Sequence, residues 1–173
     1  MADGSFSSGS YVRPYISAHG SPRTLTIQQG STASTAIFKI GDPIARGATT
    51  NAHRAVLLAT GVTANLTSFL GFAAEAVSAT GSLTTKITYW PADNETQFLG
   101  VMKTTLASTH LGQVFNLRRD STLEIAYIDG AVKATGVMAV VDDWAEGSTI
   151  GDTNGFVVFR ISQVSRQAFP ETS

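Results

Sequence analysis

Residues 24–28 read Thr24-Leu25-Thr26-Ile27-Gln28, with polar and apolar side chains in strict alternation. This period of two is typical of a β-strand that has one buried face and one face in water. Other short apolar stretches, separated by Gly, Pro, Asn and Asp, follow at residues 34–40, 52–59, 68–73, 83–90, 97–103, 113–118, 123–128, 132–141 and 156–164. A series of about ten short strands predicts an all-β fold, either a compact β-barrel or a β-sandwich.

The helical signal in the sequence is weak. Residues 73–77 and 104–111 each suffice for a turn or two of helix, but neither has the roughly ten or more periodic residues of a core helix. We therefore expect only minor helical turns within the β-fold.

The first residues differ in composition from the rest of the chain. The start, MADGSFSSGS, is rich in Gly and Ser, and a stretch of this kind forms a flexible lead. We therefore divide the chain into a flexible, extended N-terminal arm (residues 1–22), a barrel or sandwich domain (residues 23–165) and a C-terminal tail (residues 166–173).

A segment with two tyrosines and a proline lies within this arm. It reads Tyr11-Val12-Arg13-Pro14-Tyr15-Ile16, and Pro14 keeps it extended. One interpretation is a segment that binds a partner by strand addition or in a groove. The candidate partner-binding residues are then Tyr11, Arg13, Pro14, Tyr15 and Ile16. The other interpretation is a first edge strand of the domain itself.

The composition is poor in charge and rich in hydroxyl groups. The chain has 12 Lys and Arg against 13 Asp and Glu, a net charge of −1 and only 14% charged residues. By contrast, 17 Ser and 22 Thr are spread along it. Because few charges keep such a surface soluble by repulsion, we expect much of it to be covered in an assembly. We expect a homotrimer, with a dimer as the alternative.

The same composition argues against several classes of partner. Nucleic acid is not an expected partner, because phosphate binding needs clustered Lys and Arg and the one adjacent basic pair, Arg118-Arg119, is followed by Asp120. A membrane is not expected either, since a spanning helix needs about 20 consecutive apolar residues. The start of the chain lacks the basic and apolar regions of a secretory signal, and there is no Cys. These features favour a protein made and used without secretion through a cleaved signal.

The sequence contains no motif that carries catalysis or holds a cofactor. His19, His53 and His110 are scattered and show no metal-ligand spacing. The G-x-S-x-G nucleophile motif, the P-loop and the dinucleotide-binding glycine motif are all absent. We therefore expect no enzyme, no catalytic residue, no cofactor and no metal site.

Two local patterns leave a choice between a site and a structural element. Gly151-Asp152-Thr153-Asn154-Gly155 resembles the core of a calcium loop but lacks the later Glu, and Asn-Gly between two apolar runs favours a β-hairpin. The aromatic passage around Trp90 suggests a sugar-binding shelf or the end of a strand, and we prefer the strand end.

Five pieces of the sequence form an ordered series within residues 36–161. They are residues 38–44 (FKIGDPI), 69–76 (FLGFAAEA), 87–98 (ITYWPADNETQF), 112–117 (GQVFNL) and 151–155 (GDTNG), the last directly before residues 156–161. The series resembles the capsid decoration (cement, head-stabilising) proteins of tailed bacteriophages, in which a G-D-P-V turn, an L-G-I-A strand and a P-A-x-x-x-T-x-F segment follow in this order.

The resemblance implies a non-enzymatic virion structural protein. Such a protein is made in the cytoplasm of the bacterial host, binds the major capsid protein on the outer surface of the assembled capsid, and stiffens the shell against the pressure of the packaged DNA. Two alternatives remain open: a tail-tube or head–tail completion protein, and a carbohydrate-binding β-sandwich. The second alternative requires exposed Trp90 and Trp144.

Overall fold

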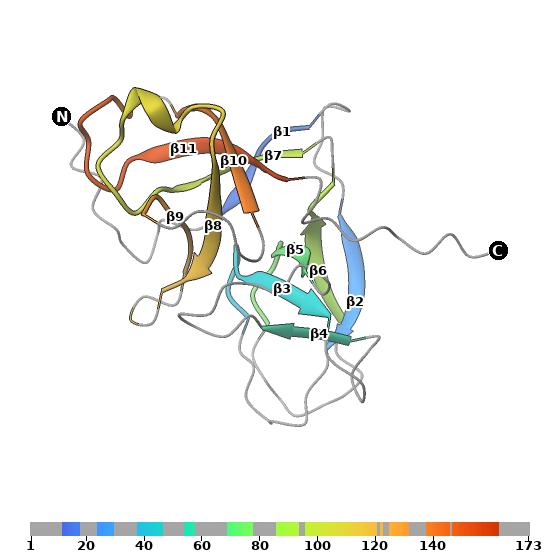
Figure 1. Cartoon of the computed structure of the whole chain (residues 1–173). Coiled ribbons are helices and arrows are strands. Elements are labelled where there is room, and N and C mark those ends of the chain that lie inside the picture. Colours follow the sequence, from blue (N-terminus) through green and yellow to red (C-terminus); the bar gives the residue numbers. More distant parts are fainter. Residues whose placement is uncertain are drawn as a thin grey trace.

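The computed structural model describes eleven parts of the chain, and all that follows concerns these. They are residues 12–17, 24–29, 38–46, 54–57, 69–77, 86–93, 96–120, 122, 125–131, 138–145 and 147–162. The elements are β1 (Arg13–Ser17), β2 (Leu25–Gln29), β3 (Pro43–Arg46), β4 (Arg54–Leu57), β5 (Phe69–Ala73), β6 (Lys86–Pro91), β7 (Thr96–Val101), the 3₁₀ turn η2 (Ser108–His110), β8 (Val114–Arg119), β9 (Ala126–Asp129), β10 (Met138–Trp144) and β11 (Phe156–Ile161) (Figure 1).

Six of the strands form one sheet, in the order β1-β7-β11-β10-β8-β9. The strand pairs of this sheet are antiparallel. A bridge between Met102 and Ile128 brings β9 beside the chain that leaves β7, so the sheet curls back toward itself. Strand β11, the last in the chain, lies in the middle of the sheet, between β7 and β10.

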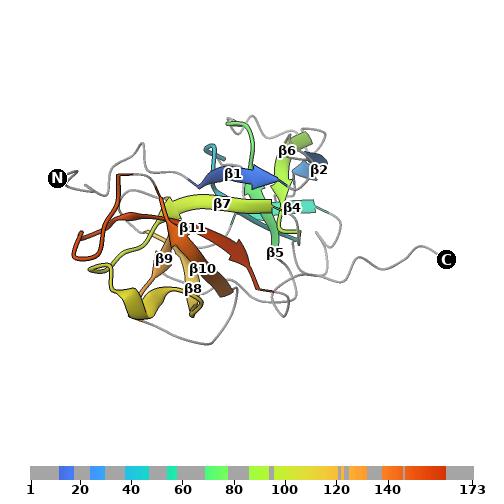
Figure 2. The ribbon, with the colours of Figure 1, turned by 90° about the horizontal axis from the view of Figure 1, so that it is seen from above.

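The other five strands form a ring, in the order β2-β4-β3-β5-β6, and β6 pairs with β2 to close it. We call these strands the five-strand ring. It packs against the six-stranded sheet, so the described parts of the chain form an all-β sandwich of two sheets and not a single barrel (Figure 2). The predicted all-β fold is confirmed.

The larger core lies where the two sheets meet, and it is rich in phenylalanine. Phe72 from the ring contacts Phe98 and Phe159 from the six-stranded sheet, with ring centroids 4.9 Å and 6.2 Å apart. Phe69 approaches Phe72 edge-on at 5.5 Å. A second core fills the ring around Phe38, Ile44 and Ile87. Aromatic burial of this extent is a main driving force for folding, and here it joins the two sheets.

The segment predicted to belong to an N-terminal arm is part of the domain where the structure describes it. Val12 is fully buried in the larger core, and β1 pairs with β7 in the register Arg13 to Leu99 and Ser17 to Thr96. Residues 12–17 therefore form a first edge strand, the second interpretation above. This corrects the predicted arm over residues 1–22 for these residues, while residues 1–11, 18–23 and 163–173 lie outside the described parts.

Most strands overlap the short apolar stretches from which the sequence predicts them, with a few differences. Strand β3 lies between the predicted stretches 34–40 and 52–59, where the sequence predicts no strand, and β10 continues through Asp142-Asp143 to Trp144 after an irregularity in its pairing. The predicted helical turn at residues 104–111 is present as η2, whereas Ala74 and Glu75 form a bend and Val77 a bridge to Phe38. In the described parts, no helix has the length and apolar character that crossing a membrane requires.

Candidate interaction surface

Two loops at one end of the six-stranded sheet form a continuous backbone framework. One loop, residues 104–113, carries η2 and connects β7 to β8, and the other, residues 147–155, connects β10 to β11. Both views show them side by side, yellow and orange-red, away from the five-strand ring (Figures 1 and 2). We call these residues the loop surface.

Backbone hydrogen bonds hold the two loops together. The amides of Leu106 and Gly151 donate to the carbonyls of Asp152 and Leu106, each at 2.9 Å. The amide of Asn154 donates to the carbonyl of Thr104 at 3.0 Å, and Thr105 forms a bridge with Thr153. Since backbone groups of both loops are satisfied by one another, the loop surface has a fixed shape before any partner arrives.

Side chains fix each loop internally. Ser148 Oγ accepts a hydrogen bond from the amide of Phe156 at 2.9 Å, and Asp152 Oδ2 accepts from the amide of Thr149 at 2.7 Å. His110 Nδ1 accepts from the amide of Ala107 at 3.2 Å. The pattern GDTNG thus forms the last turn of the β10–β11 hairpin, as predicted, with Asp152 bound to its own loop.

Asn154 and Gly155 explain why this sequence suits the turn. Asn154 has φ 56°, a left-handed conformation that asparagine tolerates better than most residues. A Cβ at position 155 would overlap Cδ1 of Leu106, which is buried beneath the loops. The glycine therefore allows the two loops to approach closely.

The loop surface has a single charged residue and is hydroxyl-rich and partly apolar. Leu111 and Ile150 are 39% and 59% exposed, two of the four exposed large apolar side chains in the described parts. Hydroxyl groups accompany them at Thr104, Thr105, Ser108, Thr109, Ser148, Thr149 and Thr153. Residues 104–113 contain no Asp, Glu, Lys or Arg, and residues 147–155 contain only Asp152. This composition suits contact with another protein surface that carries little charge.

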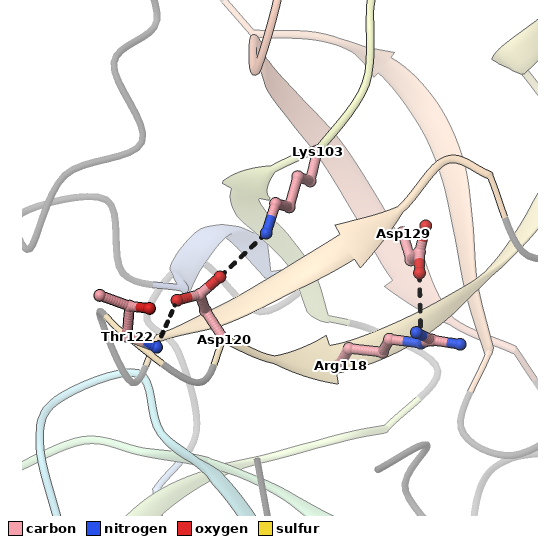
Figure 3. A network of polar contacts seen from close by, with 5 residues as sticks. All are labelled: Lys103, Arg118, Asp120, Thr122 and Asp129. Atoms are coloured by element: carbon pink, nitrogen blue, oxygen red, sulfur yellow. Dashed lines mark hydrogen bonds and ion pairs between the residues drawn. The ribbon is translucent and has the colours of Figure 1, made fainter. Parts of the chain in front are cut away.

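Two basic side chains of the six-stranded sheet and its loops, Lys103 beside the loop surface and Arg118 on β8, form ion pairs within the chain. Lys103 donates to Asp120 at 3.0 Å, and Asp120 also accepts from the amide of Thr122 (Figure 3). Arg118 pairs with Asp129 at 3.2 Å on the neighbouring strands β8 and β9. The hydrogen bond to Asp120 raises the pKa of Lys103, so this ammonium stays charged and paired at neutral pH.

A buried ion pair joins the two sheets. Arg119 at the end of β8 donates from Nε to Asp42 Oδ1 at 3.4 Å, and the other carboxylate oxygen of Asp42 accepts from the amide of Lys39 at 2.8 Å. The Arg119 and Asp42 side chains are only 6% and 1% exposed. Desolvation by burial raises the pKa of Asp42, against the opposing effects of Lys39 and Arg119. Asp42 was expected only to form a turn, so its link to Arg119 is a structural contact that the sequence did not reveal.

The residues proposed from the sequence as partner-binding do not lie on the loop surface. Arg13 and Tyr15 are exposed on β1, Pro14 is partly buried there, and Tyr11 lies outside the described parts. Ile16 pairs through its backbone with Gln97. Proline at position 14 and the irregular register beside it make β1 a poor template for a further strand.

The two tryptophans do not form an open aromatic shelf. Trp90 and Trp144 are both partly buried and pack against the larger core. His19 and His53 lie outside the described parts, and His110 packs edge-on against Phe115. Within the described parts, no group of three or more His, Cys, Asp or Glu side chains is placed to hold a metal ion.

A comparison of the chain with protein-family models gives no match, and a comparison with curated proteins gives none either.

Proposed function

We propose that the protein is a non-enzymatic virion component that binds the outer surface of an assembled bacteriophage capsid and stabilises it. Its partner is the major capsid protein. It is made in the host cytoplasm and acts on the capsid exterior. The proposal rests first on the ordered resemblance over residues 36–161 to capsid decoration proteins.

The observation that best supports the proposal is the loop surface, which has only one charged residue and a shape fixed by its own hydrogen bonds. A protein that binds an already folded lattice gains most from a contact face that loses little entropy on binding. The bonds between Leu106, Gly151 and Asp152 supply such a face. Its hydroxyl groups and two exposed apolar side chains match a contact made between folded proteins.

The carbohydrate-binding alternative has less support. A sugar shelf needs aromatic faces open to solvent, whereas Trp90 and Trp144 lie against the core. The tail-tube alternative requires rings formed by strand sharing, and Pro14 on the edge strand β1 disfavours sharing at that edge. The capsid role needs neither feature.

The proposed function is tested by adding the purified chain to undecorated capsids of the phage whose genome encodes it. We expect saturable co-sedimentation and a higher temperature of capsid disruption, because each bound copy adds contacts across the lattice. Bovine serum albumin at equal concentration is the control. Absence of binding at micromolar concentration contradicts the proposal.

We also propose that the protein self-associates as a homotrimer, with a dimer as the alternative. The low charge and the exposed side chains of Tyr15 and Ile40, which lie off the loop surface, leave area for contacts between copies. Multi-angle light scattering of the free protein is expected to give three times the mass of one 18.2 kDa chain. A monomer, both free and after release from capsids, contradicts this prediction.

A further inference from the structure

The loop surface and the five-strand ring lie at different ends of the molecule. Figure 1 places the two loops at the upper left and strands β2, β3 and β4 at the lower right, and Figure 2 separates them again from above. A protein bound through one of these ends directs the other away from its partner.

The charge distribution favours an uncharged protein surface as the partner of the loops. Residues 104–113 carry no formal charge, and Asp152 is held by Thr149. Lys103, at the border, is bound to Asp120. A nucleic acid would find no cluster of basic groups here, whereas an uncharged protein face that contacts the loops covers only one charged side chain, Asp152, which already accepts hydrogen bonds from Thr149.

The apolar content is too small for the permanent interface of an obligate oligomer. Such interfaces are large and hydrophobic, about 2,000 Å² or more in total. The described part of the loop surface offers two large exposed apolar side chains, Leu111 and Ile150, among hydroxyl groups. A few apolar anchors within a polar rim are typical of contacts between proteins that fold separately.

We infer that the loop surface, through Leu111 and Ile150, is the face that docks onto the capsid protein, leaving the five-strand ring as the outermost part of the decorated particle. This inference rests on the proposed function and adds the contact face and the orientation. The apolar side chains enter sockets on the capsid, and the surrounding hydroxyl groups form hydrogen bonds at the rim.

The test compares two double variants on the same undecorated phage capsids. Leu111→Ser with Ile150→Ser alters the loop surface, and Thr24→Ser with Thr26→Ser alters two exposed side chains at strand β2 of the five-strand ring. The first variant is expected to bind capsids at least about tenfold more weakly than the wild type, since anchor residues dominate such contacts. The second is expected to bind like the wild type. Both are expected to melt like the wild type, because the altered side chains are exposed.

The outcomes of this comparison distinguish failure of the proposed function from failure of the inferred docking face. Wild-type protein that fails to bind overturns the proposed function, and this inference with it. Wild-type binding with equal binding by the Leu111→Ser, Ile150→Ser variant overturns the inference alone. Loss of self-association in that variant, seen by light scattering, assigns the loops to a second copy and also overturns it. A cryo-EM map of decorated capsids is expected to show η2 next to the shell, and a map with the ring next to the shell contradicts the orientation.

Discussion

Replacing Asp42 with alanine is expected to lower the free energy of unfolding by about 3–5 kcal/mol, because the change removes the Asp42 carboxylate from a buried ion pair with Arg119. The substitution also removes the acceptor for the amide of Lys39. The loss is measured by urea denaturation at pH 7. The control is Arg160→Ala, which breaks the more exposed pair of Arg160 with Asp142 and is expected to cost at most about 1 kcal/mol. Equal losses in the two variants would contradict a special role for the buried pair.

The pH dependence of Asp42→Asn separates the charge of Asp42 from its shape. Burial raises the pKa of Asp42 above the ordinary 3.8, so the folded protein binds this proton more tightly than the unfolded chain does. The contribution of this group to stability is therefore complete below 3.8 and is lost as the pH rises through the raised pKa. Acidification from pH 7 is expected to increase the stability of the wild type relative to Asp42→Asn. A relative decrease would mean that the ion pair outweighs desolvation and lowers the pKa.

Replacing Phe72 with alanine is expected to cost about 3–5 kcal/mol of unfolding free energy. Its ring is fully buried and contacts Phe69, Phe98 and Phe159, so the cavity would open between the two sheets. Thermal and urea denaturation measure the loss, and Phe72→Leu, which leaves a smaller cavity, is expected to lose less. A cost below about 1 kcal/mol for the alanine variant would show that the sheets do not depend on this ring.

The alternation of side chains predicts the strands well where one face is buried. Residues 24–28 are predicted from this pattern and residues 83–90 from their apolar content, and β2 and β6 occupy most of them. Along β6 the described burial alternates strictly from Lys86 to Pro91, as a strand with two different faces requires. A local pattern is enough here, because the same residues decide both the strand and its buried face.

Strands β3 and β1 show where local pattern reading fails. Pro43 follows Gly41-Asp42 and was assigned to a turn, yet proline is tolerated as the first residue of a strand. For β1 the sequence left two interpretations open, since an apolar extended segment suits an arm and an edge strand equally. Only the burial of Val12 and the pairing with β7 decide between them.

The candidate site was harder to predict than the fold because its two halves are distant in sequence. The sequence predicts a short helical turn within residues 104–111 and a hairpin turn at residues 151–155, and both local predictions agree with the structure. Their contact depends on the bond from Asn154 to Thr104, which follows from the pairing of β11 with β7. The sequence instead predicts partner binding at residues 11–16, because two tyrosines in an extended segment form a pattern that can be recognised locally.

The central position of β11 sets the order in which the protein can fold during synthesis. All strands of the five-strand ring have been synthesised once Pro91 is added. The six-stranded sheet cannot be completed until Phe156–Ile161, which form β11 between β7 and β10, have left the ribosome. Until then, β7 and β10 each have an edge open to pairing with another nascent chain. Closing the sheet also joins residues far apart in sequence, which slows folding. The interval between release of β10 and insertion of β11 is therefore the period when misassembly is most favoured.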